Sequence, residues 1–283
     1  MSAHVDPIAD PSDSRLASYR EARDGRVRGA GLFLAEGRLV VRRLLESRFA
    51  VRSVLATRAV LDDLGDALGR RPSVQRYEAS AETIQAVVGF KFHRGCLALG
   101  EEGAPTPARA IIEPSGSRLV VGLEDVADPD NVGAVFRNAA AFGAAAVLLS
   151  PGCADPLYRK AIRVSMGATL AMPFATIDWR DGLEALHAAG YTRVALTPHP
   201  GAQRLDLVVA AGLLSRRLAV LLGAEGAGLT EATRRAADLA VRIAMIPGVD
   251  SLNVATACAI ALHRLADVAR PSDVRSMMDG DPS

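Results

Sequence analysis

The chain has 283 residues, of which 49% are hydrophobic and 23% charged, and its formal net charge is +1. This size allows one large domain or two ordinary ones, and this composition excludes wholesale disorder. No apolar run reaches the ~18 residues of a membrane helix, and the acidic, Pro-containing start lacks the basic and apolar regions of a secretory signal. Three widely spaced cysteines form no disulfide framework. We therefore expect a cytoplasmic protein without membrane attachment.

Positive charge is concentrated near the N-terminus. Between residues 14 and 58 the chain has eleven arginines and four acidic residues. Such a basic stretch suits phosphate contacts and favours nucleic-acid binding, with an Arg-rich solvated face as the alternative. Aromatic residues make up only 4% of the chain, which argues against base-stacking platforms as the mode of binding.

In chain order, residues 1–13 lack periodicity and are predicted to be a flexible tail. From residue 14 to residue 102, β-like runs alternate with helical patterns between glycine and proline breaks. The predicted strands are 51–56, 73–77 and 96–99, and the predicted helices are 37–48, 58–68 and 80–88. This pattern predicts a small α/β domain, which a Pro- and Gly-containing linker at 103–117 connects to the rest of the chain.

The second domain is predicted over residues 118–270, before a flexible C-terminal tail at 271–283. Its predicted strands are 119–123, 145–149, 193–196, 218–222 and 241–245. Its predicted helices are 131–142, 156–167, 179–189, 229–237 and 252–269. Nearly continuous apolar strands separated by helices indicate a parallel sheet that is covered on both faces.

Three polar or glycine-rich segments follow predicted strands of this domain, where ligands bind in open α/β sheets. The first, 128–138, contains Asn131 and Arg137 at the start of a helix, a position that favours anions. Arg137 has the fork geometry for a phosphate. On the alternative interpretation, Arg137 is a surface residue, and Asp130 or Asn131 only caps the helix.

The second segment, 223–229, holds Glu225 among three glycines whose order is not that of the dinucleotide-binding fingerprint. Glycines there allow close backbone approach or positive φ, although a plain strand–helix turn is an equal alternative. The third segment, 243–254, places Ser251 and Asn253 at the start of the last helix, where capping is their ordinary role. The sequence has no nucleophile elbow, phosphate-binding lysine loop or metal-spaced histidine cluster, so no metal is expected.

Together, in this order and spacing, the three segments resemble the SpoU-class (TrmH-like) RNA ribose 2′-O-methyltransferases of the SPOUT superfamily. The matching motifs are Asn131…Arg137-Asn138, Leu222-Gly-Ala-Glu-Gly-Ala-Gly-Leu229 and Ser251-Leu-Asn-Val254. The resemblance covers residues 115–270. Residues 33–37 and 89–95 also resemble the two ends of the RNA substrate-binding module that is often fused to these enzymes. That module is similar in fold to small ribosomal proteins.

The resemblance implies an α/β fold with a deep trefoil knot in the C-terminal parallel-sheet domain and S-adenosylmethionine bound by the knot loops. It also implies a homodimer whose active site takes residues from both subunits. By motif position the catalytic residues would be Asn131, Arg137, Glu225, Ser251 and Asn253. The cofactor-binding residues would be Thr197, Gly223, Ile243 and Leu252. In the first domain we expect RNA contacts from Arg38, Arg42, Arg43 and Arg94.

One departure from the family pattern is Ala244, which stands where proline is common. We expect it to loosen the cofactor loop slightly without abolishing binding. Ribosomal RNA is the preferred substrate, since a separate RNA-gripping domain suits a structured ribosomal element. The alternatives are a tRNA 2′-O-methyltransferase, a methyltransferase acting on an RNA base, and a non-catalytic RNA-binding assembly factor. A Rossmann dehydrogenase is weaker still for want of the glycine fingerprint.

Overall fold

The structure, a computed structural model, describes residues 4–23, 30–89, 95–113, 119–212, 214–246 and 248–269. Its contacts divide the chain into two compact units, each with its own β-sheet. The first unit is Met1–Ala104 with Pro156–Ala171, and the second is Pro105–Asp155 with Met172–Ser283. Arg94 and the predicted tail at 271–283 lie outside the described residues. Both units combine strands and helices, so the predicted α/β class is confirmed.

The first unit contains a mixed five-stranded sheet in the order β1-β4-β3-β5-β2. Its strands are β1 (Asp6–Pro7), β2 (Leu32–Glu36), β3 (Ala50–Ala56), β4 (Gln75–Glu78) and β5 (Cys96–Glu101). Strand β5 runs antiparallel to β2 and β3, while β1, β3 and β4 are parallel. Its helices are η1 (Ser14–Leu16), α1 (Ala17–Arg23), α2 (Arg38–Glu46), α3 (Arg58–Asp63), α4 (Gly65–Gly69), α5 (Ala81–Val88), α8 (Arg159–Val164) and α9 (Ala168–Ala171).

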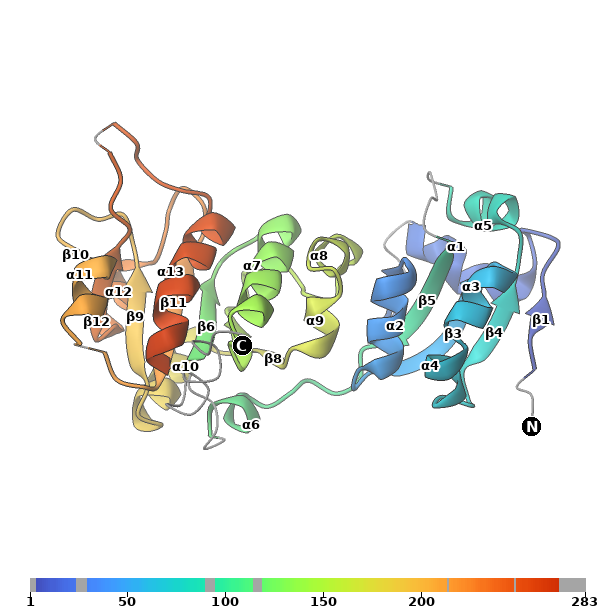
Figure 1. The fold of residues 1–283 in the computed structure, drawn as a ribbon, viewed down its shortest axis with the longest axis horizontal. Helices are drawn as coiled ribbons and strands as arrows, with labels where there is room; N and C mark the ends of the chain where they lie inside the picture. The colour runs from blue at the N-terminus through green and yellow to red at the C-terminus, as the bar shows by residue number, and fades with distance from the viewer. Residues whose placement is uncertain are drawn as a thin grey trace, which may run out of the picture. The chain divides into compact units, whose positions relative to one another are not determined.

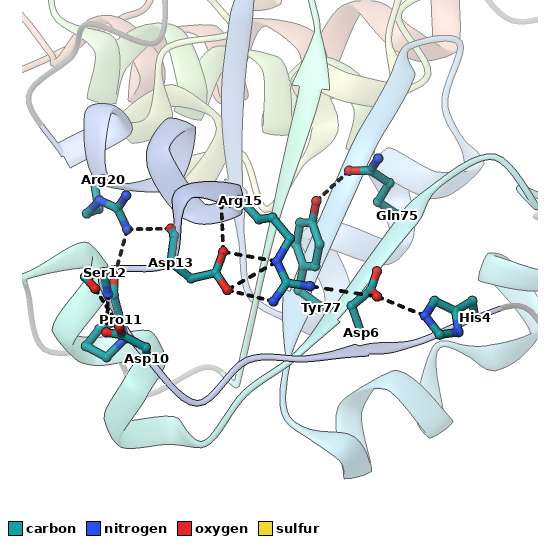
Figure 2. Close-up of polar contacts among 10 residues, drawn as sticks. All are labelled: His4, Asp6, Asp10, Pro11, Ser12, Asp13, Arg15, Arg20, Gln75 and Tyr77. Carbon is teal, nitrogen blue, oxygen red and sulfur yellow. Dashed lines mark hydrogen bonds and ion pairs between the residues drawn. The ribbon is translucent and has the colours of Figure 1, made fainter.

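Residues 4–13 include β1 of this sheet, so this described part of residues 1–13 is not the flexible tail that was expected. Strand β1 pairs with the edge strand β4, and the Ile8 N–H donates to the Glu78 carbonyl at 2.7 Å. Ile8 is buried at 4% exposure. Asp13 caps η1 and forms an ion pair with Arg15 at 2.6 Å, and hydrogen bonds from Arg15 lower the Asp13 pKa to about 2 (Figure 2). The sequence did not predict this strand because Ile8 is the single apolar residue that holds it, and one residue cannot form a periodic apolar pattern.

The second unit contains a seven-stranded sheet in the order β10-β12-β9-β11-β6-β7-β8, and every pairing in it is parallel. Its strands are β6 (Leu119–Glu124), β7 (Ala146–Leu149), β8 (Phe174–Thr176), β9 (Thr192–Leu196), β10 (Gln203–Arg204), β11 (Leu218–Gly223) and β12 (Leu239–Arg242). Its helices are α6 (Ala108–Ile112), α7 (Pro129–Ala141), α10 (Trp179–Ala188), α11 (Leu205–Ala210), α12 (Glu231–Ala236) and α13 (Val254–Ala269). The predicted parallel sheet is therefore confirmed.

Helices cover both faces of this second sheet. Helices α6 and α10 pack on one face, where Val120 of β6 and alternate residues of β7 and β11 form a shared apolar core with them. Helices α7 and α13 pack against each other over the opposite face (Figure 1). Helix α6 lies within the predicted linker, yet Ile111 and Ile112 are 3% and 1% exposed. This apolar pair makes α6 a core element of the unit.

The strand order decides which strand ends are neighbours in this sheet. Strand β11 lies between β6 and β9, and β12 lies on the far side of β9. The carboxyl ends of β9, β11 and β12 are consequently neighbours, although these strands are far apart along the chain. Within the described part of the chain, no helix is both long and apolar enough to cross a membrane.

Candidate active site

A cavity of about 400 Å³ opens at the carboxyl ends of β9, β11 and β12. This volume falls in the range of roughly 300–1,000 Å³ that small-molecule sites occupy. All four residues predicted to bind the cofactor line it: Thr197 follows β9, Gly223 ends β11, Ile243 follows β12, and Leu252 precedes α13. The four residues were assigned to the cofactor only by their positions in motifs, and the structure places all four around one cavity.

The glycine-rich segment folds back on the end of β11. Ala224 and Gly228 form an antiparallel bridge, in which the Gly228 N–H donates to the Ala224 carbonyl at 2.9 Å. A Cβ at Gly223 would lie 2.1 Å from the carbonyl carbon of Gly228, so no side chain fits there. Gly226 and Gly228 have φ values of 81° and 69°, which L side chains rarely adopt. The glycines are therefore required by the loop itself, which places Glu225 at the cavity wall.

The helix of the first polar segment, α7, begins two residues earlier than predicted. Asp128 caps α7 by accepting a hydrogen bond from the Asp130 N–H at 2.9 Å, and Pro129 occupies the first helical turn. Proline suits that turn because its missing N–H would have no helical partner there. The expectation that Asp130 or Asn131 caps this helix is wrong, and the side chain of Asn131 is consequently available for other contacts.

Asn253 joins the three segments. Its Nδ2 donates hydrogen bonds to Asn131 Oδ1 and to Glu225 Oε1, each at 2.8 Å. Its Oδ1 accepts from the N–H groups of Ala255 and Thr256 at 3.0 and 3.2 Å, which caps α13. The capping and site interpretations of this residue are therefore compatible, because one side chain performs both roles.

Arg137 is not brought to the cavity within one chain. It is exposed on α7 and is not among the cavity-lining residues, whereas Ser251 is. At ~100° per residue, the six positions from Asn131 to Arg137 turn the helix by about 240°, onto a different side. Arg137 makes no hydrogen bond or ion pair with any other residue that the structure describes. Its guanidinium is thus open to a ligand or to another molecule.

Ala244 is exposed and does not line the cavity, whereas Ile243 and Met245 on either side of it do. The residue that departs from the family pattern is therefore not itself part of the wall. Pro198 and Met245 line the cavity without having been predicted. The signal for both was their position at or just after the end of a predicted strand, which the motif-based assignment did not use.

The arginines of α2 differ in their availability. The side chain of Arg38 is 62% exposed. Arg42 forms an ion pair with Asp66 at 2.8 Å, and Arg43 donates to the Met166 carbonyl at 2.7 Å within the first unit. All three described candidates for RNA contact thus have protein partners, since Arg38 pairs with Asp63 at 3.9 Å, and Arg38 is the most accessible of them.

Comparison with known proteins bears directly on this site. Residues 118–263, more than half of the chain and all three polar segments, match the model of the SpoU rRNA Methylase family. The chain belongs to this family. It is therefore an RNA methyltransferase, and the cavity and the Asn253 bridge lie within the part that defines the family.

Relatives of this SpoU methylase extend over both units. An uncharacterized tRNA/rRNA methyltransferase of Mycobacterium tuberculosis H37Rv is 43% identical over 266 residues, covering 92% of this chain and 91% of its own length. The 23S rRNA (guanosine-2′-O-)-methyltransferase RlmB of a Burkholderia species is 33% identical over 187 residues, covering 65% of this chain and 74% of the relative.

Solved structures agree with the fold of the SpoU methylase. The AdoMet-bound rRNA methyltransferase of Sinorhizobium meliloti superimposes with a TM-score of 0.79 at 24% identity, over 93% of this chain and 98% of that one. A crystal structure of an RNA 2′-O ribose methyltransferase gives a TM-score of 0.73 at 26% identity with the same coverage. The two-unit architecture is therefore shared along nearly the whole length.

Proposed function

We propose that this SpoU methylase transfers a methyl group from S-adenosylmethionine to a ribose 2′-hydroxyl of ribosomal RNA, in the cytoplasm. The observation that carries the proposal is the Asn253 bridge, which ties Glu225 at the wall of the cavity to the buried Asn131 of α7. Asn253 joins the buried Asn131 of α7 to the exposed carboxylate of Glu225 in the glycine loop. Capping of α13 requires neither of these two hydrogen bonds, so we interpret them as organising the site.

The cavity walls fit S-adenosylmethionine. Leu222, Ile243 and Leu252 provide apolar surface for a purine, and the glycine loop leaves backbone groups accessible to a ligand. Glu225 adds a carboxylate, the charge that a cationic ligand prefers. When bound, the cofactor supplies a methyl group made electrophilic by a positively charged sulfur. The similarly folded Sinorhizobium meliloti protein has AdoMet bound.

The residues of this chain must position the acceptor and provide a route for its proton. A ribose hydroxyl is a weak acid, so alignment and proton removal both contribute to the barrier. An arginine guanidinium stays protonated in proteins and is therefore a poor base. We therefore assign Arg137 to holding a substrate phosphate and orienting the hydroxyl, whose proton passes to that phosphate or to solvent. Asn253 and Asn131 keep the cavity wall in place during this alignment.

The position of Arg137 supports a homodimer. Because Arg137 is exposed and turned away from the cavity of its own chain, we propose that each cavity receives Arg137 of the partner subunit. We also propose that the second unit contains the trefoil knot that the family resemblance implies. Isologous dimers are the commonest oligomers, and they make such an exchange reciprocal.

Ribosomal RNA is proposed over transfer RNA for two reasons. The first unit adds a separate domain with Arg38 exposed for phosphate contacts, which suits a structured RNA element. The RlmB relative is described as acting on 23S rRNA. A tRNA substrate, as the wording for the Mycobacterium relative also allows, is the second candidate.

The decisive experiment incubates the protein and labelled S-adenosylmethionine with separate ribosomal and transfer RNA pools, followed by mass spectrometry of the labelled nucleotide. We expect label in ribosomal RNA, on a ribose. Label in transfer RNA alone would show that the substrate is transfer RNA and not ribosomal RNA. Label on a base would show that the enzyme methylates a base and not a ribose. Absence of cofactor binding in calorimetry would instead indicate an RNA-binding factor without catalysis.

A mixing experiment tests the shared site. Arg137→Ala and Asn253→Ala are each expected to have little activity alone at a cofactor concentration near the wild-type Kd, each through a different half of the composite site. Subunit exchange between them makes about half of the dimers mixed, and each mixed dimer has one intact site. Activity regained on mixing supports the exchange, whereas no regain under conditions of proven subunit exchange refutes it.

A further inference from the structure

Glu124 is a buried acidic residue to which the mechanism above gives no role. It ends β6 and is 5% exposed, but it does not line the cavity. It lies outside the three motifs that carry the family resemblance. A residue of this kind acts on a ligand only through other groups, so its contacts decide what it does.

The carboxylate of Glu124 accepts three hydrogen bonds from the start of α12. Its Oε2 accepts from the Thr230 N–H at 2.9 Å, and its Oε1 accepts from the hydroxyls of Thr230 and Thr233 at 2.8 and 2.6 Å. Among the residues that the structure describes, no arginine, lysine or histidine forms an ion pair with it. A buried carboxylate costs free energy that an apolar side chain of similar size does not. Apolar packing therefore gives no reason for a glutamate here, and its role lies in the three hydrogen bonds that it accepts.

Glu124 contacts both ends of the glycine loop. In the pairing of β6 with β11, its backbone is in register with Gly223, the residue at which the loop begins. Its side chain holds Thr230, which directly follows the loop at 223–229. One residue thus sets the separation of the two loop ends. Because this loop supplies Glu225 and four neighbouring residues to the cavity wall, that separation also sets the shape of the cavity.

A further hydrogen bond, from Trp179, supports the contact between Glu124 and Thr233. The Thr233 hydroxyl accepts a hydrogen bond from Trp179 Nε1 at 2.9 Å while it donates to Glu124, and Thr233 is 1% exposed. Trp179 lies against β6, where a Cβ on Gly122 would be 3.0 Å from the indole ring. The chain has no other tryptophan. Its fluorescence consequently reports on the surroundings of Trp179, which include this hydrogen-bond network.

We infer that Glu124 is a positioning residue that keeps the glycine loop in its cofactor-binding conformation and so raises the affinity for S-adenosylmethionine. A loop held in place before binding avoids the entropy loss of being ordered by the ligand. This inference rests on the proposed function, since it concerns the same cofactor and the same cavity. It assigns the contribution of Glu124 to binding, not to the chemical step.

The test is Glu124→Gln. The amide keeps the shape of the side chain, but its NH₂ group replaces one of two oxygens that together accept three donors. We expect the Kd for S-adenosylmethionine, measured by calorimetry, to rise about tenfold, the effect of losing one hydrogen bond to a charged group. The KM for the cofactor rises in parallel, while kcat at saturating cofactor stays at the wild-type level.

Two matched comparisons separate positioning from general destabilisation. Thr233→Val is isosteric and removes the hydroxyl, so it weakens cofactor binding and shifts the Trp179 emission, whereas Thr233→Ser retains both properties. Asp238→Asn removes hydrogen bonds that Arg193 donates at the amino end of β9, whereas the cavity lies at the carboxyl ends of the strands. It lowers the melting temperature and leaves the Kd for the cofactor unchanged.

The outcomes are distinct. Wild-type affinity in Glu124→Gln overturns the inference and leaves the proposed function intact, provided that the wild-type protein binds the cofactor. Equal weakening of binding in Glu124→Gln and Asp238→Asn also overturns it, because both changes would then act through stability. If the wild-type protein itself does not bind S-adenosylmethionine, the proposed function fails and the inference fails with it.

Discussion

Replacing Asn253 by serine isolates the bridge between the three segments from the cap of α13. Serine is as good an N-cap as asparagine, so the N–H groups of Ala255 and Thr256 keep an acceptor. The shorter hydroxyl does not reach both Asn131 and Glu225. The change therefore removes the cross-loop bonds selectively and introduces no charge.

The magnitude follows from the two lost bonds. Each is 2.8 Å long, and an intramolecular hydrogen bond contributes about 1 kcal/mol net. We keep the bond to Glu225 at this neutral value, because its surroundings are exposed to solvent. Asn131 is 7% exposed, so its Oδ1 does not regain full hydration. A loss of about 2 kcal/mol corresponds to roughly 30-fold weaker cofactor binding if the bridge organises the cavity.

The assay combines calorimetry of S-adenosylmethionine binding with urea unfolding, in Asn253→Ser and Asn253→Ala. The serine variant is expected to bind weakly and to retain more stability than the alanine variant, which also loses about 1 kcal/mol of capping. Wild-type affinity in the serine variant, together with weak binding in the alanine variant, would refute the reasoning. That pattern would make the cap of α13, and not the bridge, the feature on which the cavity depends.

Three further results are expected. Arg137→Ala folds and binds the cofactor but loses methyl transfer by ~10²-fold or more, as measured with labelled RNA. Gly223→Ala weakens cofactor binding in calorimetry more than Gly226→Ala does, because a Cβ at 223 meets backbone at 2.1 Å, whereas at 226 it meets open space and only the positive φ costs about 1–2 kcal/mol. Hydrogen bonds from Arg193 hold the Asp238 pKa below its usual value. That stabilisation is complete above about pH 4 and disappears as the pH falls through the lowered pKa, so the difference in urea stability between wild type and Asp238→Asn narrows below about pH 4.

Much of the secondary structure follows from local pattern. Apolar runs such as that of β11 are short and continuous, which predicts buried parallel strands, and the structure confirms them. Prediction was wrong where few residues carry the signal. A single apolar anchor, Ile8, docks the first segment, and the adjacent pair Ile111 and Ile112 turns part of a Pro-rich stretch into a core helix.

The cap of α7 was predicted at the wrong residue although the sequence carries the signal for the right one. Asp130 and Asn131 are both good N-cap residues, but Asp128 takes that role and Pro129 the first turn. The preference of Pro129 for the first helical turn is a property of the sequence, and it locates the cap at the residue before it. With the cap at Asp128, the side chain of Asn131 is left free for a tertiary contact.

The amino-acid sequence alone is sufficient for the α/β class, the parallel second sheet and the three polar segments, because each depends on neighbours a few residues apart. The meeting of those segments depends on the fold. Asn253 lies 122 positions from Asn131 and 28 from Glu225, and Glu124 lies 106 from Thr230. Which of these pairs come into contact follows from the placement of β11 between β6 and β9, and that order arises from the packing of the whole sheet and its helices, which no local pattern encodes.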